Sequence, residues 1–412
     1  MSADWSTLPL DLLGNIAFKM DSFEDFIYFS AVCRSWNCAS SSIKHLWRAP
    51  SLPWLLLAEN TQGNPNCLRN IFNLNNNKHY SLNLPETFGA RCWGSPYGWI
   101  AMAKRDLTVQ LFNPFTKANI SFPSLQTLPH LPIYEPGSFD DSWYDYYDWV
   151  LMFFLQKLIV LKVPQSGGHH EFVIILLSPE YKGLSFAKCG DQAWTTILIE
   201  DLVLGVYDVL VMNDLVFALY NYDGAIAYWS VKEFYGAGVV KPTIYSPGKY
   251  RIFERLNVCT NYAYLVQSGS DLLMVLRFKE DVMDSDDLYD IVYRTIEFKI
   301  YKLNPKDQNW ENIKDLGDIV LFVGDNSSMS VSLAHAKGLR QNSVYFTDDD
   351  TESWLCPPEQ GGILAGRDMG VFNLRTNRIE RFYEGNDRRS SICSPTWFIP
   401  HFKIVLGLGS SY

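Results

Sequence analysis

The chain has 412 residues, of which 47% are hydrophobic and 19% charged, and its formal net charge is −10. This composition is globular and leaves little room for long disordered stretches. The negative charge disfavours binding to nucleic acid or to anionic membrane surfaces, because the sequence contains no basic patch to override it. At this length, one small and one large domain are expected.

The first segment is predicted to form three short helices. The apolar positions of LPLDLLGNIAFKM recur at helical spacing. A second helix is expected to start at Ser22, with Asp25 three residues on in an arrangement like a capping box. A third, shorter helix is expected over 34–40. We therefore predict a helical domain over residues 1–48 and a second domain over 49–412.

From about Leu55 onward, short apolar runs broken by Gly, Asn, Asp and Pro predict a mainly β body of more than about 20 strands. The most apolar run, 150–163, is too short to cross a bilayer and contains Lys157, so buried strands are expected there. The aspartates at 348–350 are expected at a hairpin tip.

A weak internal repeat runs through this body. Segments starting at Ile71, Leu111, Ile300 and Val371 each contain an apolar strand, a tight turn and a second strand. The first two start 40 residues apart; the last two start 71 apart, which we interpret as close to two periods. A recurrence near about 40–45 residues predicts a β-propeller of roughly six to eight blades, with these segments as outer hairpins. Paired β-sandwiches are the alternative fold.

The cysteines favour a reducing compartment. Eight of them are scattered without a C-x-x-C pair, unlike a small secreted domain held by disulfides. No basic segment followed by a clean apolar run is visible at the start of the sequence, so we expect no secretory signal. We predict a location in the nucleus, the cytoplasm or both, because no basic import cluster distinguishes them.

Candidate catalytic and metal-binding groups are weak. Cys33, Cys38 and His45 lack a fourth ligand at suitable spacing, and His169 and His170 lack the helical spacing of H-E-x-x-H. The sequence contains no G-x-S-x-G motif, P-loop or dinucleotide fingerprint. We therefore predict no metal, no cofactor and no catalytic residue, in a protein that is not an enzyme.

The opening segment resembles an F-box. It has a Leu-Pro start, a Leu-Leu pair and an Ile along one helix, and the signature Val-Cys-Arg-x-Trp about twenty residues later. The resemblance implies that this segment binds a Skp-type adaptor. The residues that carry it are Leu8, Pro9, Leu12, Leu13, Ile16, Val32, Cys33, Arg34 and Trp36.

The rest of the chain resembles the KIB-type β-propeller that follows F-boxes in a large plant family. Similar segments include ARCWGSPYGWIAM, LFNPFTKANISFPSL and GVFNLRTNRIERFY. The resemblance implies the substrate-recognition subunit of an SCF-type ubiquitin ligase, with the adaptor linking the F-box to a cullin and the propeller binding an unknown target protein. The alternatives are an F-box scaffold outside a ligase, and an enzymatic or sugar-binding propeller.

Physical reasoning supports a neighbour or a partner for the first segment: either its apolar residues bind an adaptor, or they form the core of a helical cap packed on the propeller. Three short helices in about 40 residues cannot bury enough surface to be stable alone. For the target, we select an acidic, aromatic-rich segment, because exposed Trp and Tyr are common interface anchors. Its aromatic residues are Trp143, Tyr144, Tyr146, Tyr147 and Trp149. A structural flap over a propeller edge is the alternative role for this segment.

Overall fold

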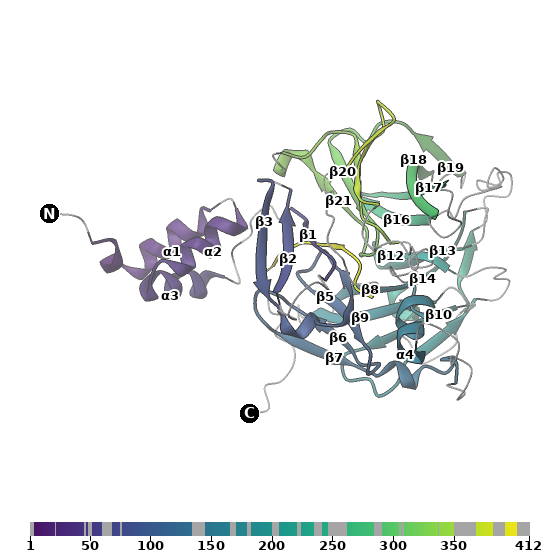
Figure 1. Ribbon diagram of the computed structural model, residues 1–412, viewed down its shortest axis with the longest axis horizontal. Helices are drawn as coiled ribbons and strands as arrows, with labels where there is room; N and C mark the ends of the chain where they lie inside the picture. The colour runs from purple at the N-terminus through teal and green to yellow at the C-terminus, as the bar shows by residue number, and fades with distance from the viewer. Residues whose placement is uncertain are drawn as a thin grey trace.

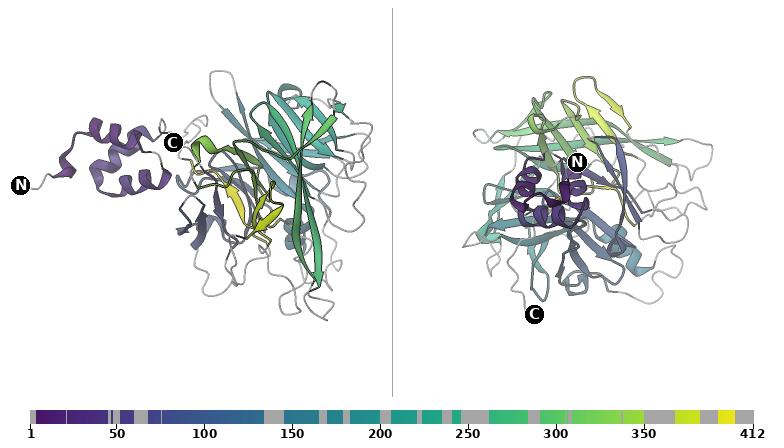
Figure 2. Two further views of the ribbon diagram at one scale, coloured as in Figure 1. Left: turned by 90° about the horizontal axis from the view of Figure 1, so that it is seen from above. Right: turned by 90° about the vertical axis from the view of Figure 1, so that its left-hand side faces the viewer.

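The computed structural model places a small helical unit beside a ring of β-sheets (Figure 1). The helical unit lies to one side of the ring (Figure 2). The structure describes residues 4–20, 22–44, 47, 52–59, 68–74, 76–133, 145–164, 170–178, 183–199, 206–220, 224–234, 241–245, 262–283, 291–304, 306, 309–336, 338–349, 368–381 and 392–401.

Three α-helices form the helical unit, as predicted. The first follows Pro9 and carries Asp11 in its first turn, near the positive end of the helix dipole. The second is capped by Ser22, whose hydroxyl accepts a hydrogen bond from the N–H of Asp25 at 3.0 Å. The elements are the 3₁₀ turn η1 (Trp5–Thr7), α1 (Leu10–Phe18), α2 (Phe23–Ala31) and α3 (Arg34–Ile43).

Six sheets surround a common centre within the described residues, which makes the second part a six-bladed β-propeller. Blade 1 holds β25 (Thr396–Phe398), β1 (Trp54–Leu56), β2 (Leu68–Asn73) and β3 (Lys78–Asn83). Blade 2 holds β4 (Ala90–Gly94), β5 (Ile100–Lys104), β6 (Val109–Phe112) and β7 (Asn119–Phe122). Blade 3 holds β8 (Lys157–Pro164), β9 (His170–Leu177), β10 (Gly183–Lys188) and β11 (Thr195–Leu198).

The remaining blades follow in chain order. Blade 4 holds β12 (Val206–Met212), β13 (Leu215–Tyr220), β14 (Ala225–Ser230) and β15 (Thr243–Tyr245). Blade 5 holds β16 (Tyr262–Ser268), β17 (Asp271–Met283), β18 (Ile291–Asn304) and β19 (Asn309–Ile313). Blade 6 holds β21 (Met329–Ser332), β20 (Ile319–Val323), β22 (Ser343–Phe346), β23 (Gly370–Asn373) and β24 (Arg378–Glu380). Short helical elements between strands are η2 (Pro85–Thr87), η3 (Leu125–Thr127), α4 (Tyr146–Trp149), the π-helical turn η4 (Val150–Phe154), α5 (Val231–Phe234) and η5 (Leu333–His335).

The ring is closed by the C-terminal strand. β25 pairs antiparallel with β1, placing Trp397 opposite Leu55. Because one sheet contains strands from both ends of the propeller sequence, the chain that follows blade 6 is hydrogen-bonded into blade 1, which closes the ring.

Each blade packs its two faces against its two neighbours. Along β8, Val160 contacts the cluster shared with blade 2, whereas the adjacent Ile159 contacts the cluster shared with blade 4. Side chains of a strand alternate between the two faces of the sheet, so a strand buried on both faces is apolar at successive positions. This explains the unbroken apolar runs in the sequence.

The predicted outer hairpins are confirmed. The four repeated segments form β2–β3, β6–β7, β18–β19 and β23–β24, the two outermost strands of their blades. Two of the turns, β6–β7 and β23–β24, share one mechanism. The Asn113 carboxamide oxygen accepts from the N–H groups of Phe115 and Thr116 at 3.0 Å, and Asn373 does the same for Arg375 and Thr376 at 3.1 Å.

Two expectations about these strands were wrong. The 71-residue spacing separates neighbouring blades 5 and 6, because blade 6 holds five strands, two of them (β20 and β22) in parallel. The apolar run at 150–163 forms strand β8 only in its second half, and its first half is the helical turn η4. A short run without periodicity does not distinguish a buried helix from a buried strand.

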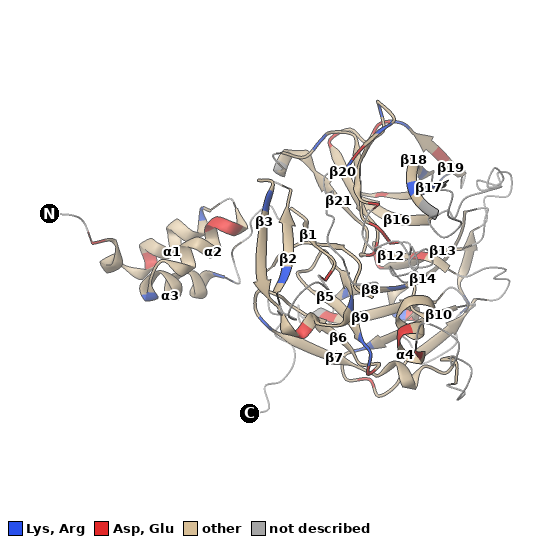
Figure 3. Cartoon of the chain, in the orientation of Figure 1, with Lys and Arg blue, Asp and Glu red and all other residues tan. Residues whose placement is uncertain are grey.

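Positively and negatively charged residues are interspersed along the chain, including the strands of the ring (Figure 3). Among the described residues, no helix is long and apolar enough to cross a membrane.

Candidate functional site

One face of the helical unit holds its helices together. Leu13 and Ala17 of α1 are buried with Phe26 and Phe29 of α2 and Ala39 of α3. Residues three or four apart lie on the same side of a helix, so each helix directs one apolar stripe into this small core. The structure therefore places Leu13, predicted among the adaptor-binding residues, in the core of the unit.

Another face of the unit is apolar and open. The side chains of Leu12 and Ile16, one turn apart on α1, are 48% and 42% exposed, and Val32 at the end of α2 is 58% exposed. Leu10 and Phe18, at the two ends of α1, are also exposed. Single exposed apolar residues are ordinary, but several on so small a unit mark an interaction surface.

The Val-Cys-Arg-x-Trp signature lies where α2 ends and α3 begins. Cys33 takes the N-cap position of α3 and is half-buried. Arg34 is exposed and forms no ion pair within the described part of the chain. Trp36 is half-buried, and its indole N–H donates to the carbonyl of Trp5 at 3.0 Å. Trp36 therefore shapes the unit, whereas Arg34 points to the solvent side.

The Leu-Pro start leads into α1. Leu8 packs partly buried against the core of the unit, and Pro9 is exposed at the N-cap of α1. The predicted adaptor-binding residues at the surface are Pro9, Leu12, Ile16, Val32 and Arg34, those partly buried are Leu8, Cys33 and Trp36, and Leu13 is buried.

The predicted target-binding segment is described only from residue 145 onward, so Trp143 and Tyr144 lie outside the described residues. Tyr146 is buried and its hydroxyl donates to a backbone carbonyl at 2.8 Å. Trp149 is half-buried, whereas Tyr147 is 43% exposed. A role in target binding stays a prediction, with Tyr147 as its most accessible described residue.

The same segment is held to blade 2 by charge. Arg105, in the turn between β5 and β6, pairs with Asp145 at 2.6 Å and with Asp148 at 2.8 Å. Asp145 also caps α4 by accepting from the N–H of Asp148. These contacts favour the structural-flap interpretation for the part of the segment that is described.

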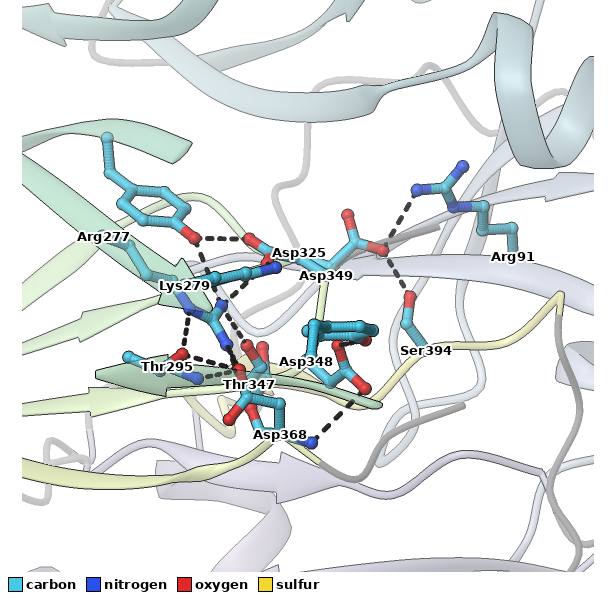
Figure 4. Close-up of polar contacts among 12 residues, drawn as sticks. Arg91, Arg277, Lys279, Thr295, Asp325, Thr347, Asp348, Asp349, Asp368 and Ser394 are labelled. Carbon is cyan, nitrogen blue, oxygen red and sulfur yellow. Dashed lines mark hydrogen bonds and ion pairs between the residues drawn. The ribbon is translucent and has the colours of Figure 1, made fainter. Parts of the chain in front are cut away.

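Charged groups that sequence reasoning did not select meet inside the propeller (Figure 4). Arg277 of β17 is fully buried and donates to Asp349 at 2.7 Å, to Asp368 at 2.9 Å and to the carbonyl of Thr347 at 2.7 Å. Its Nε donates to Thr295 of β18 at 2.7 Å. The guanidinium thus joins blade 5 to the ends of β22 and β23 in blade 6.

A second buried pair lies at the centre of the ring. Arg91 of β4 lies 3.4 Å from Asp325, which follows β20, and also donates to the carbonyl of Leu151 at 2.6 Å. Asp325 accepts a hydrogen bond from Ser394, just before β25. Burial raises the pKa of Asp325, an effect that Arg91 opposes. This pair connects blades 1, 2 and 6.

The expectation that residues 348–350 form a hairpin tip was wrong for the two that are described. Asp348 is fully buried and accepts from the hydroxyl of Tyr293, and the Asp349 side chain is only 7% exposed; Asp350 lies outside the described residues. Burial raises the pKa of Asp348 to about 6, against the opposing effect of Lys279.

The buried charges compensate one another. Burial acts to raise the pKa of Asp368, but Arg277 and the Thr295 hydroxyl outweigh it and hold that pKa below its ordinary value. Removing charges from water is costly unless each is paired and hydrogen-bonded. A signal for the network was present in the sequence, since Arg277 and Lys279 lie two residues apart, and so on one face, of the otherwise apolar strand LLMVLRFK.

Metal binding finds no support in this geometry. No cluster of three or more His, Cys, Asp or Glu side chains is arranged to hold a metal ion in the part of the chain that the structure describes. The ion pairs of Figure 4 are better explained as contacts that stabilise the packing of neighbouring blades, because each guanidinium pairs with carboxylates and donates to backbone carbonyls.

Comparison with known proteins agrees with both parts. Residues 5–48 match the F-box domain family, and residues 71–373 match the KIB1-4 β-propeller family. Arabidopsis thaliana F-box protein SKIP23 is 26% identical, over 92% of this chain and 91% of that protein. F-box protein At2g17036 is 26% identical over 92% and 90%, and F-box/kelch-repeat protein At1g57790 is 25% identical over 91% and 90%, both from Arabidopsis thaliana.

Proposed function

Because the chain belongs to the family of F-box proteins with a KIB1-4 β-propeller, we propose that it is the substrate-recognition subunit of an SCF-type ubiquitin ligase. The F-box binds a Skp-type adaptor, which links the protein to a cullin. The propeller binds a target protein, and it does so in the nucleus, the cytoplasm or both.

The open apolar face of the helical unit carries this proposal. Leu12, Ile16 and Val32 are each more than two-fifths exposed, although Leu13 and Ala17 on the same unit are completely buried. Exposing such side chains to water is unfavourable by about 25 cal/mol per Å² of apolar surface, so a partner that covers them gains that free energy. An adaptor helix face with matching apolar residues is the partner that fits.

In the proposed function this chain makes and breaks no covalent bonds. One part binds the adaptor and the other binds the target, so ubiquitin transfer proceeds because the target is held close to the transfer machinery. The protein acts as a non-catalytic subunit, without a cofactor.

A binding assay with a purified Skp-type adaptor tests the proposal. The variant Leu12→Ala/Ile16→Ala/Val32→Ala removes exposed side chains from the F-box and leaves its core intact. The matched control Leu198→Ala/Ile244→Ala/Ile296→Ala removes three apolar side chains of the propeller with similar exposure, 57%, 44% and 42%. Because a few anchors carry most of the free energy of binding, the first variant should weaken adaptor binding at least about 100-fold and the control should not.

The outcomes separate the functions. Equal adaptor binding by wild type and the F-box variant, or no binding by wild type, would refute the proposal. Adaptor binding without ubiquitin transfer in a reconstituted ligase would indicate a scaffold. Ligand binding or activity that survives deletion of residues 1–48, without adaptor capture, would indicate an enzymatic or sugar-binding propeller.

A further inference from the structure

The helical unit is fastened to the propeller by side chains at the start of α2. Phe23, the first residue of α2, is 4% exposed. Its ring lies 4.6 Å from that of Phe115, in the β6–β7 turn of blade 2, and 5.6 Å from that of Trp54 of β1 in blade 1. Both contacts are edge-on, a favoured geometry for aromatic pairs.

The adjacent residue adds polar contacts to the same blade. The carboxylate of Glu24 accepts hydrogen bonds from the side-chain amides of Asn73, at the end of β2, and of Asn76, at 3.4 Å, in the turn that follows. Asn76 also donates to the hydroxyl of Tyr80 at 2.9 Å. Burial raises the pKa of Glu24, in keeping with a carboxylate that the propeller covers.

These contacts rest on a rigid base. The ring of Trp54 stacks on that of Tyr80 at 5.5 Å, and the ring of Phe115 lies 6.3 Å from that of Phe398 in the closing strand β25. The F-box side is equally well supported, since Trp47 packs on Phe26 at 4.4 Å and its indole N–H donates to a backbone carbonyl at 3.2 Å. These contacts of Phe23 and Glu24 with blades 1 and 2, called the junction below, thus connect the packed core of the F-box with that of the propeller.

Covalent connectivity alone would not fix this arrangement. Trp47 is packed on the F-box, so six residues, 48–53, separate it from the start of β1 at Trp54. A freely flexible linker of that length has an r.m.s. end-to-end distance of about 13 Å, enough for a small domain to take many orientations. The contacts of Phe23 and Glu24 select one of them, and they leave Leu12 and Ile16 uncovered.

We propose that Phe23, Glu24 and Phe115 are positioning residues: they hold the propeller in one orientation relative to the partner bound to the open F-box face. This inference rests on the proposed function, because a fixed orientation matters when a target must be presented to a transfer site. These residues act through geometry, because their contacts join the F-box to blades 1 and 2.

Distance measurements on the full-length protein bound to a Skp-type adaptor test the inference. Spin labels at Ser41 of α3 and Leu198 of β11 are attached through a ketone-bearing unnatural amino acid, so that native cysteines stay unlabelled. Wild type should give one narrow distance distribution. Glu24→Ala/Phe115→Ala should broaden it, with adaptor affinity unchanged; Glu24→Gln, which keeps the acceptor oxygen, should stay narrow.

A matched control removes the same residue types elsewhere. Phe88→Ala/Glu280→Ala truncates an exposed Phe and a half-exposed Glu away from the junction and should also stay narrow. Should the junction double variant unfold at a lower denaturant concentration than this control, Glu24→Ala alone is used. A second measurement maps self-ubiquitination sites in a reconstituted ligase: wild type should modify a restricted set of propeller lysines, and the loosened variant a wider set.

The possible failures are distinguishable. A broad distance distribution in wild type, or a narrow one in folded Glu24→Ala/Phe115→Ala or Glu24→Ala, overturns the inference while leaving adaptor binding intact. Absence of adaptor capture by wild type overturns the proposed function, and with it the role of the junction in transfer, even where the free protein gives a narrow distribution.

Discussion

Replacing Arg277 with methionine should destabilise the propeller strongly. The guanidinium is fully buried, with hydrogen bonds of 2.7–3.0 Å to the carboxylates of Asp349 and Asp368 and to backbone carbonyls. Methionine conserves much of the volume but leaves these acceptors unpaired. Breaking a buried pair by removing one partner costs about 3–5 kcal/mol, and that is the expected loss in the free energy of unfolding.

Urea unfolding followed by tryptophan fluorescence measures this loss, and an exposed ion pair on the same hairpin provides the control. Arg294 and Glu280 lie 3.1 Å apart with side chains nearly half exposed. Arg294→Met should cost only about 0–1 kcal/mol, because solvent screens an exposed pair. Equal losses in the two variants, or a loss below about 1 kcal/mol for Arg277→Met, would refute the view that buried charge compensation holds blades 5 and 6 together.

The pH dependence gives a second check on the same variant. In wild type the pKa of Asp368 is depressed, so its contribution to stability is present above the unfolded-state pKa and is lost as pH falls through the folded-state value. Without Arg277, the largest effect that opposes burial is lost, and only Thr295 and Lys279 still lower the pKa of Asp368. That pKa therefore rises, and protonation relieves the unpaired charge. The deficit should therefore be smaller at about pH 5 than at about pH 7.5.

Two further predictions concern single positions. The pKa of Asp348 is raised to about 6, so this residue contributes stability at low pH that is lost as pH rises through about 6. In Asp348→Asn, the urea concentration at the unfolding midpoint should therefore change less between about pH 5 and pH 7.5, and the variant should be as stable as wild type or more stable at the upper end. An unchanged pH profile would contradict this. Asn113→Ala removes the oxygen that accepts from the N–H groups of Phe115 and Thr116, and the amide that donates to the carbonyl of His401, and should cost about 1–3 kcal/mol of unfolding free energy. Asn119→Ala, which removes an exposed contact with Gln110 in the same hairpin, should cost less, and equal costs would show that the Asn113 side chain does not hold the turn.

Local chemistry was sufficient to predict several elements from sequence. The start of α2 depended on a hydroxyl at Ser22 and an N–H three residues later, both encoded within one turn. The outer hairpins depended on an Asn side chain that bonds to the backbone two and three residues on, as at Asn373. The segments that form these hairpins recur along the chain, and the spacing of the first two pointed to a propeller.

Contacts between distant residues escaped the same reasoning. The side chains of Arg277 and Asp368 are 91 positions apart, and those of Arg91 and Asp325 are 234 apart. Asp348 has the composition of an exposed turn, and only the fold brings Tyr293 and Lys279 to its buried carboxylate. The run at 150–154 was equally ambiguous, because an apolar run that is buried on all sides carries no periodicity.

By itself, the sequence determined the helical unit, the strand-rich body and the motif that points to an adaptor, since each depends on spacing within a few tens of residues. Tertiary structure decided the number of blades, the pairing of the last strand with the first, the buried charges and the seating of Phe23 and Glu24 on blades 1 and 2. The physical reason is that these features exist only after strands far apart in the chain have packed together, when burial turns a solvated charge or an exposed ring into a specific contact.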